Sequence, residues 1–237
     1  MREYFEKLYK GTVKDFQDAV NSAIDNEDKL FIVTANPETF SYGERNEDFN
    51  KLLTDKSVTL VPDGISIVKA SKMLEMPCAE RITGVDLASY LFEVANNKKL
   101  NIALLGAKEK IIGTLVNKLK RDYPAINIVA YQNGYEENKD SFFDNIKNKD
   151  VDICLVALGI PSQELLIYNN LNKFNKGIFV GVGGSFDVLS GIKKRAPKCF
   201  QKLNIEWLYR IIKEPKRIKR FYNNNVKFMF KVMRLNK

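Results

Sequence analysis

The chain has 237 residues, 45% of them hydrophobic, which is enough to bury a core in one domain or in one domain with an appendage. It contains no histidine and only three scattered cysteines, which removes the usual general base and the usual zinc ligands. The net charge of +9 is uneven, because residues 193–237 carry 15 of the 38 Lys and Arg residues and only two acidic residues.

The sequence shows the pattern neither of a secreted protein nor of a membrane-spanning one. The first residues, "MREYFEKLYKGTVKDF", are charged and lack the apolar block of a secretory signal. The longest apolar run is about that of "ICLVALGI", which is too short to span a bilayer. Cys78, Cys154 and Cys199 form no C-x-x-C pair and fit a reducing compartment. We therefore expect a cytoplasmic protein.

Apolar runs of strand length alternate with helical patterns from residue 29 to residue 184. The expected strands are 29–35, 57–64, 100–107, 126–131, 151–159 and 176–184. The expected helices between them are 43–54, 65–75, 108–123, 138–148 and 161–173. Strands rich in Ile, Val and Leu, each followed by a helix, predict an α/β fold with a largely parallel, Rossmann-like sheet and helices on both faces.

The pattern changes after residue 192. From Pro215 onward a new helix is predicted, with apolar residues at helical spacing and with Lys213, Arg217 and Arg220 on one face. We therefore divide the chain into an α/β catalytic domain, 1–192, and a basic amphipathic helical appendage, 193–237. Such a charge asymmetry favours an anionic partner, so we expect the appendage to bind a diphosphate or an anionic membrane surface.

Polar residues and glycines follow the predicted strands where each strand ends. Ligands of open parallel sheets gather at the carboxyl ends of the strands, so these residues should share one rim. Thr34 and Asn36 suit sugar hydroxyls, although Asn-Pro is also common in turns. The full set is Thr34, Asn36, Asp63, Gly64, Gly106, Gly159, Gln163, Gly183 and Gly184.

Each of these motifs also has a structural interpretation. The turn at 181–186, "GVGGSF", either presents N–H groups to a phosphate or is only a tight turn. Asp63 is either a base aimed into the crevice or a turn or cap residue. Arg81 and Asp86 are either site residues or purely structural ones, Arg81 in an ion pair and Asp86 at the N-terminus of a helix. The "DVD" at 150–152 matches a metal-binding pattern but precedes its strand, so we interpret it as a solvated strand entry.

Eight segments taken together, in this order, resemble the WecG/TagA/CpsF glycosyltransferase family over about residues 8–222. They are "TANPETF", "VPDGISIVKAS", "ERITGVDL", "LLGA", "LGIPSQE", "GVGGSFDVLSG", "KRAP" and "EWLYRIIKEPKRIKRF". Several ordered blocks are far more specific than any one of them.

The resemblance implies a reaction class. Members transfer a sugar, often N-acetylmannosamine (ManNAc), from UDP to a GlcNAc on undecaprenyl diphosphate, at the cytoplasmic face of the membrane. They serve cell-wall polymers such as wall teichoic acid or capsule. The resemblance implies an inverting reaction that requires no metal and no cofactor, a UDP-sugar donor, and a peripheral position on the inner face of the cell membrane.

The resemblance also implies roles for residues. The proposed base of the family falls on Asp63, and its Thr-x-Asn motif falls on Thr34 and Asn36. Its pocket arginine corresponds to Arg81 and the Gln of its Pro-x-Gln-Glu motif to Gln163. The arginines of its C-terminal segment match Arg210, Arg217 and Arg220. This chain departs from the family pattern at Ser162, in the apolar "LLIY" run that follows Gln163, and at Cys199, so the donor or acceptor is left open.

An alternative from another class is a nucleic-acid-binding module. The basic appendage with Trp207, Tyr209, Phe221 and Tyr222 suits contact with phosphates and stacking on bases. The acidic balance of residues 1–192 and the polar rim argue against it, and we expect no nucleic-acid partner. The "LLIY" run is either core or an exposed surface, which leaves a homo-oligomer open.

Overall fold

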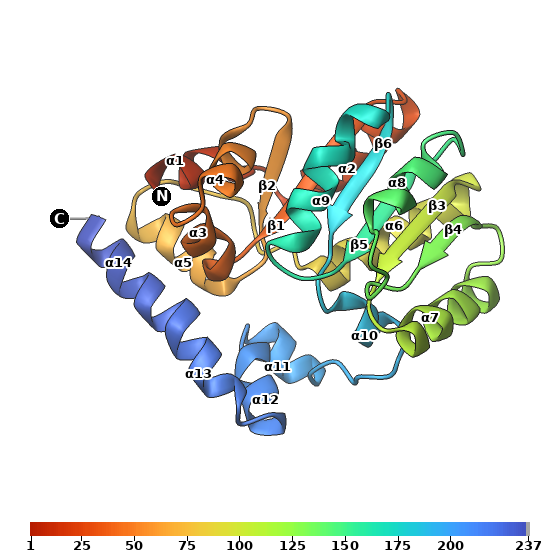
Figure 1. Cartoon of the computed structure of the whole chain (residues 1–237). Coiled ribbons are helices and arrows are strands. Elements are labelled where there is room, and N and C mark those ends of the chain that lie inside the picture. The colour runs from red at the N-terminus through yellow and green to blue at the C-terminus, as the bar shows by residue number, and fades with distance from the viewer. Residues whose placement is uncertain (236–237) are drawn as a thin grey trace.

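A computed structural model describes residues 1–235, with Arg220 described by its backbone only, and confirms the predicted α/β class (Figure 1). All strand pairs are parallel, in the order β2-β1-β6-β5-β3-β4. The strands are β1 (Lys29–Ala35), β2 (Val58–Pro62), β3 (Asn101–Gly106), β4 (Asn127–Gln132), β5 (Ile153–Ala157) and β6 (Gly177–Gly181). Each one overlaps a strand that the apolar runs predicted.

Helices follow the strands in the expected alternation. The helices of residues 1–192 are α1 (Arg2–Lys7), α2 (Val13–Asp25), α3 (Pro37–Gly43), α4 (Glu47–Thr54), α5 (Ile65–Met73), α6 (Gly84–Lys98), α7 (Glu109–Asp122), α8 (Asp140–Ile146), α9 (Ser162–Asn170) and α10 (Ser185–Leu189). Those of the appendage are α11 (Lys198–Lys202), α12 (Glu206–Lys213), α13 (Arg217–Phe221) and α14 (Lys227–Leu235), with a π-helical turn at Tyr222–Val226.

Both faces of the sheet are covered. In β1, Phe31 and Val33 pack in one core cluster while Ile32 packs in the other, because successive side chains of a strand point to opposite faces. Helices α1, α3, α4, α5, α8, α9 and α14 contribute to the first cluster, and α2, α6, α7 and α10 to the second. The "LLIY" run packs with the first cluster, where Ile167 is fully buried, so it supplies no argument for a homo-oligomer.

The helix predicted over 43–54 is present as α4, but it begins later, at Glu47, and the sequence analysis missed α3 before it. The chain forms two helices here because two asparagines start separate helices. Asn36 accepts hydrogen bonds from the N–H groups of Glu38 and Thr39, and Asn46 accepts one from Phe49 at 2.8 Å. Pro37 stands in the first turn of α3, where its missing N–H costs nothing.

The far end of the appendage packs back onto the body (Figure 1). Phe228 and Val232 of α14 are buried, and the ring of Phe228 lies 6.2 Å from that of Phe5 and 6.3 Å from that of Phe40. A deletion from residue 193 would therefore remove part of the core. The boundary at 192/193 stays a prediction, and single substitutions are the sharper way to test the appendage.

We expect Phe228→Ala to destabilise the protein by about 3–5 kcal/mol, because it leaves a cavity between α14 and the body. Phe230→Ala, in the same helix but 58% exposed, should change stability by less than about 0.5 kcal/mol. Urea denaturation of both variants measures the difference. Equal effects would contradict the docking of α14.

The prediction that Lys213 and Arg217 lie on one helix face is wrong, because α12 ends at Lys213 and a separate helix, α13, begins at Arg217. The turn around Pro215 separates the two helices. No helix within residues 1–235 is long and apolar enough to cross a bilayer.

Candidate active site

Asp63 stands directly after β2, at the rim where the strands end. Its N–H donates to the carbonyl of Ala35 at 2.9 Å, which ties it to the end of β1. A Cβ placed on Gly64 would lie 3.3 Å from Pro37 and 3.7 Å from the Cβ of Asn36. The ends of β1 and β2 thus meet closely, and Asp63, Gly64 and Asn36 lie together as predicted.

The environment of Asp63 suits a base. Burial raises the pKa of its carboxyl group to about 6, a shift that the nearby Arg210 and Arg81 oppose. The charge of Glu206 raises the pKa further, and a backbone hydrogen bond from Gly84 lowers it. A carboxylate with a pKa close to neutral is able to accept a proton near pH 7 and still be mostly ionised.

Thr34 and Asn36 use part of their polar groups in the fold. The Thr34 hydroxyl donates to the carbonyl of Gly181 at 3.0 Å, which joins β1 to β6. The Asn36 Oδ1 caps α3. Within residues 1–235, no hydrogen bond engages the Asn36 Nδ2, which is therefore the donor that this side chain offers at the rim.

Gln163, in the first turn of α9, is buried beneath the rim and is only 2% exposed. Its Oε1 accepts hydrogen bonds from the N–H groups of Gly159 at 3.0 Å and Gly183 at 2.9 Å, and its Nε2 donates to Glu164 at 2.7 Å. Gln163 thus holds two glycine turns together. In this arrangement the two glycine N–H groups serve the fold and are not directed at a phosphate.

The glycine turn after β6 adjoins the start of α6. A Cβ on Gly84 would lie 3.1 Å from the Ser185 Oγ and 3.4 Å from the Val182 carbonyl. Since the backbone of Gly84 is also near enough to Asp63 to lower the pKa of its carboxyl group, the turn that contains Gly183 and Gly184 lies close to the candidate base.

Gly106 belongs to another part of the rim. Its φ is +117°, and a Cβ there would lie 2.4 Å from the carbonyl oxygen of Ala157, so the tight β3–β5 approach requires glycine. None of its described contacts joins it to Asp63.

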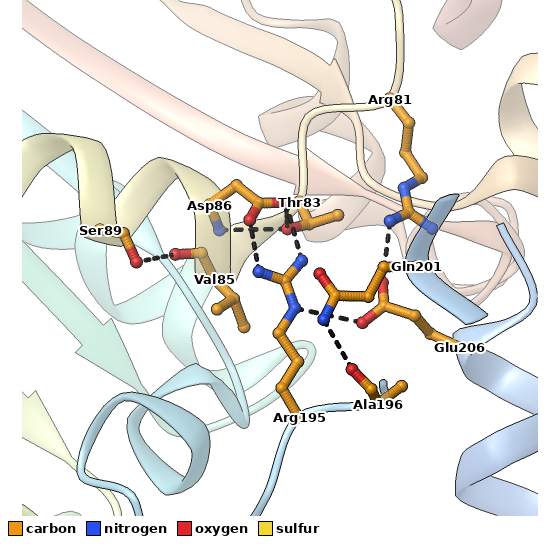
Figure 2. Close-up of polar contacts among 9 residues, drawn as sticks. All are labelled: Arg81, Thr83, Val85, Asp86, Ser89, Arg195, Ala196, Gln201 and Glu206. Atoms are coloured by element: carbon orange, nitrogen blue, oxygen red, sulfur yellow. Dashed lines mark hydrogen bonds and ion pairs between the residues drawn. The ribbon is translucent and has the colours of Figure 1, made fainter. Parts of the chain in front are cut away.

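Arg81 pairs with the appendage (Figure 2). Its Nη2 lies 2.8 Å from the Glu206 Oε2, and the Glu206 Oε1 lies 3.2 Å from the Arg195 Nε. Arg195 also makes a bidentate pair with Asp86, at 2.5 and 2.9 Å. The two residues that the sequence singled out, Arg81 and Asp86, are thus joined to each other through Glu206 and Arg195.

The three predicted arginines of the appendage differ in placement. Arg210 lies near enough to Asp63 to lower the pKa of its carboxyl group. The Arg217 Nε lies 2.8 Å from the Oε2 of Glu214, three residues before it in the chain. The side chain of Arg220 lies outside the described residues.

Sequence reasoning missed Glu206 and Arg195. A signal was available, because Glu206 is one of only two acidic residues in a strongly basic segment. Its partners are 11 and 125 residues away along the chain, so no local pattern could identify them.

Asp150 and Asp152 lie at the opposite rim, before β5, as the sequence predicted. The Lys176 ammonium lies 2.8 Å from Asp150 and 3.2 Å from Asp152, and the Asn101 N–H donates to Asp152 at 2.8 Å. These carboxylates stabilise the starts of the strands. Within residues 1–235 no group of three or more Asp, Glu or Cys side chains is placed to hold a metal ion.

Glu164 is fully buried behind the rim, and its Oε2 has no hydrogen-bond partner among the described residues. Burial raises the pKa of its carboxyl group from 4.5 to about 7. Between these values the folded protein keeps a proton that the unfolded chain releases, so this group makes stability fall as pH rises.

Glu164→Gln replaces the titrating carboxyl group with an amide that is neutral at both pH values. We expect the gain in stability of this variant over wild type to be larger at about pH 8 than at about pH 5. Thermal denaturation of both proteins at the two pH values measures it. The same difference in Tm at both would contradict a raised pKa.

Comparison with known proteins finds relatives that match most of the chain. A family model described as "Glycosyl transferase WecG/TagA/CpsF family" matches residues 6–237. A protein of Bacillus subtilis (strain 168) is 40% identical over 197 residues, 83% of this chain and 77% of its own. Proteins of Bacillus spizizenii and Staphylococcus aureus (strain MW2) are each 38% identical, over 83% and 86% of this chain and 76% and 79% of theirs. All three are named N-acetylglucosaminyldiphosphoundecaprenol N-acetyl-beta-D-mannosaminyltransferase. The chain belongs to the WecG/TagA/CpsF family and is a glycosyltransferase.

Proposed function

We propose that this glycosyltransferase moves ManNAc from UDP to the GlcNAc of undecaprenyl-diphosphate-GlcNAc, with inversion and without a metal ion, in the synthesis of a cell-wall polymer. The shared name of the relatives supports the sugar and the acceptor. The observation that carries the mechanism is a carboxylate of raised pKa, Asp63, beside two arginines in a chain without histidine.

In the proposed reaction a hydroxyl of the acceptor GlcNAc attacks the anomeric carbon from the face opposite UDP. Its proton passes to the Asp63 carboxylate as the new C–O bond forms. The old C–O bond breaks, and its electron pair leaves on the β-phosphate oxygen of UDP. Because negative charge grows on that oxygen, Arg81 and Arg210 stabilise the transition state more than the bound substrate. Their guanidinium forks match phosphate oxygens, which is the role that a metal ion fills in other transferases.

The proposed acceptor lies in a membrane, and the appendage suits that surface. Exposed apolar side chains stand among its lysines and arginines, so the segment presents both apolar and cationic contacts to anionic lipid. They are Leu203, Trp207, Leu208, Ile212, Ile218, Tyr222, Phe230, Met233 and Leu235. We propose that the protein lies peripherally on the inner face of the cell membrane.

Two of the four aromatic residues that suggested the nucleic-acid alternative are already paired with each other. Trp207 and Phe221 stack on each other, with ring centroids 4.3 Å apart and an interplanar angle of 12°. Neither ring presents both faces to a base.

The proposal is tested by UDP release from UDP-ManNAc, UDP-GlcNAc and UDP-glucose, with and without a short-chain lipid-diphosphate-GlcNAc acceptor. We expect release from UDP-ManNAc that requires the acceptor and is unchanged by EDTA. Loss of release in EDTA, restored by Mg²⁺, would contradict metal independence. Preference for another donor would contradict the sugar, and absence of release with all three would contradict the function.

A further inference from the structure

Helix α12 is attached to the body through one charged residue. Glu206 is the single buried residue of α12, which the structure describes throughout. Trp207, Leu208 and Ile212 of the same helix are exposed. The position of α12 relative to the sheet therefore depends on ion pairs and not on an apolar contact.

Both carboxylate oxygens of Glu206 are used, one by Arg81 and one by Arg195 (Figure 2). The Arg195 guanidinium lies between two carboxylates, with its Nε toward Glu206 and its two terminal nitrogens on Asp86. The side chains are mostly buried, with exposed fractions of 8% for Glu206, 16% for Arg81 and 24% for Arg195. Removing one member of such a set leaves its partners as uncompensated buried charges.

The residues of this ion-pair network lie close to Asp63. Asp86 accepts a hydrogen bond from the Thr83 hydroxyl at 2.6 Å, and the backbone of Gly84, the residue after Thr83, lies near enough to the Asp63 carboxyl group to lower its pKa. On the appendage side, Arg210 follows Glu206 by four residues in α12, so both project from one face of the helix. Fixing Glu206 therefore fixes where Arg210 stands.

We propose that Arg195 and Glu206 are positioning residues, whose ion pair anchors α12 to the start of α6 and thereby holds Arg210 beside the Asp63 carboxylate. Arg195 need not touch the substrate in this account, since it acts through Glu206 and Arg210. The consequence for catalysis rests on the proposed function, whereas the anchoring itself does not.

The kinetic test is a double-mutant cycle of Arg195→Gln and Arg210→Gln. We expect Arg195→Gln to lower kcat/KM about tenfold in the wild-type background and less than about twofold in the Arg210→Gln background, because the two residues act as one unit. Arg195→Lys keeps the charge but loses the fork, so we expect an intermediate kcat/KM. Equal effects of Arg195→Gln in both backgrounds would overturn the proposal.

The pH profile is a second readout. The charged groups that face Asp63 are Arg210, Arg81 and Glu206. Release of α12 moves away Arg210, the largest influence that lowers the pKa of Asp63, together with Glu206, a smaller influence that raises it. The acid limb of kcat/KM should therefore move to higher pH in Arg195→Lys, although the net charge is unchanged. An unmoved limb in a variant of reduced activity would indicate a merely structural role and would overturn the proposal.

The anchor is also testable without turnover, because the chain has a single tryptophan, Trp207, next to Glu206. We expect acrylamide to quench Trp207 more strongly in Arg195→Gln and Glu206→Gln than in wild type. Lys176→Gln is the matched control, since Lys176 also bridges several carboxylates, is 21% exposed, and lies at the opposite rim. It should leave both quenching and kcat/KM at wild-type values.

The outcomes separate the two proposals. Increased quenching in a protein that turns over no donor would support the anchor and contradict the proposed function. Quenching and kcat/KM in Arg195→Gln equal to those of Lys176→Gln, in a protein that transfers sugar, would overturn the anchor alone. Increased quenching with unchanged kcat/KM in Arg195→Gln would overturn the proposal that the anchor positions Arg210, since Arg210 would then need no positioning.

Discussion

Asp63→Asn should lower kcat by about 10²–10⁴-fold, because the amide cannot accept the proton of the attacking hydroxyl. The size of the substitution is small, and the N–H of residue 63 still donates to Ala35, so the rim should keep its shape. The measurement is acceptor-dependent UDP release at saturating donor and acceptor.

The pH dependence of the wild type completes this prediction. A base whose pKa is about 6 is protonated, and inactive, below that pH. We expect kcat/KM to fall about tenfold for each pH unit below 6 and to level off above it. Asp152→Asn, at the opposite rim, should keep wild-type kcat, and an Asp63→Asn protein of undiminished kcat would refute Asp63 as the base.

Arg210→Gln should lower kcat/KM by about 10²-fold, because it removes a preorganised cation from the departing diphosphate. It should also raise the pH of the acid limb, since Arg210 is the largest influence that lowers the pKa of Asp63. Both effects are measured in one experiment, the pH profile of kcat/KM.

Lys213→Gln is the control for this result, because it removes the same charge from the same helix, α12. Lys213 lies over the ring of Tyr209 and does not figure among the groups that set the pKa of Asp63. If both variants shift the acid limb equally, the effect comes from the overall charge of the appendage and not from Arg210.

Local pattern was sufficient for the sheet and for much of the rim. Five of the six strands are mostly buried, so each appears in the sequence as a continuous apolar run, such as "KLFIVTA" for β1, whereas the edge strand β4 is only partly buried. Once the strands are parallel, their carboxyl ends must meet at one edge. That is why Asn36, Asp63 and Gly183, far apart along the chain, could be predicted to share a rim.

Local sequence pattern was insufficient where a side chain contacts residues that lie far away along the chain. Gln163 was expected to face the substrate, yet it lies buried between two glycine turns, because the turn after β6 approaches it from 20 residues away. The anchor of Arg195 and Glu206 depends on contacts 109 and 125 residues apart along the chain. Such contacts depend on the folded arrangement, so spacing along the chain cannot reveal them.

The most direct test of the account is mass spectrometry of the lipid product. Wild type and Asp63→Asn are incubated side by side with UDP-ManNAc and a short-chain lipid-diphosphate-GlcNAc. The account predicts that wild type adds one N-acetylhexosamine to the lipid and that Asp63→Asn leaves the lipid almost unchanged over the same time. A lipid of unchanged mass with wild type, or equal product from both proteins, would contradict it.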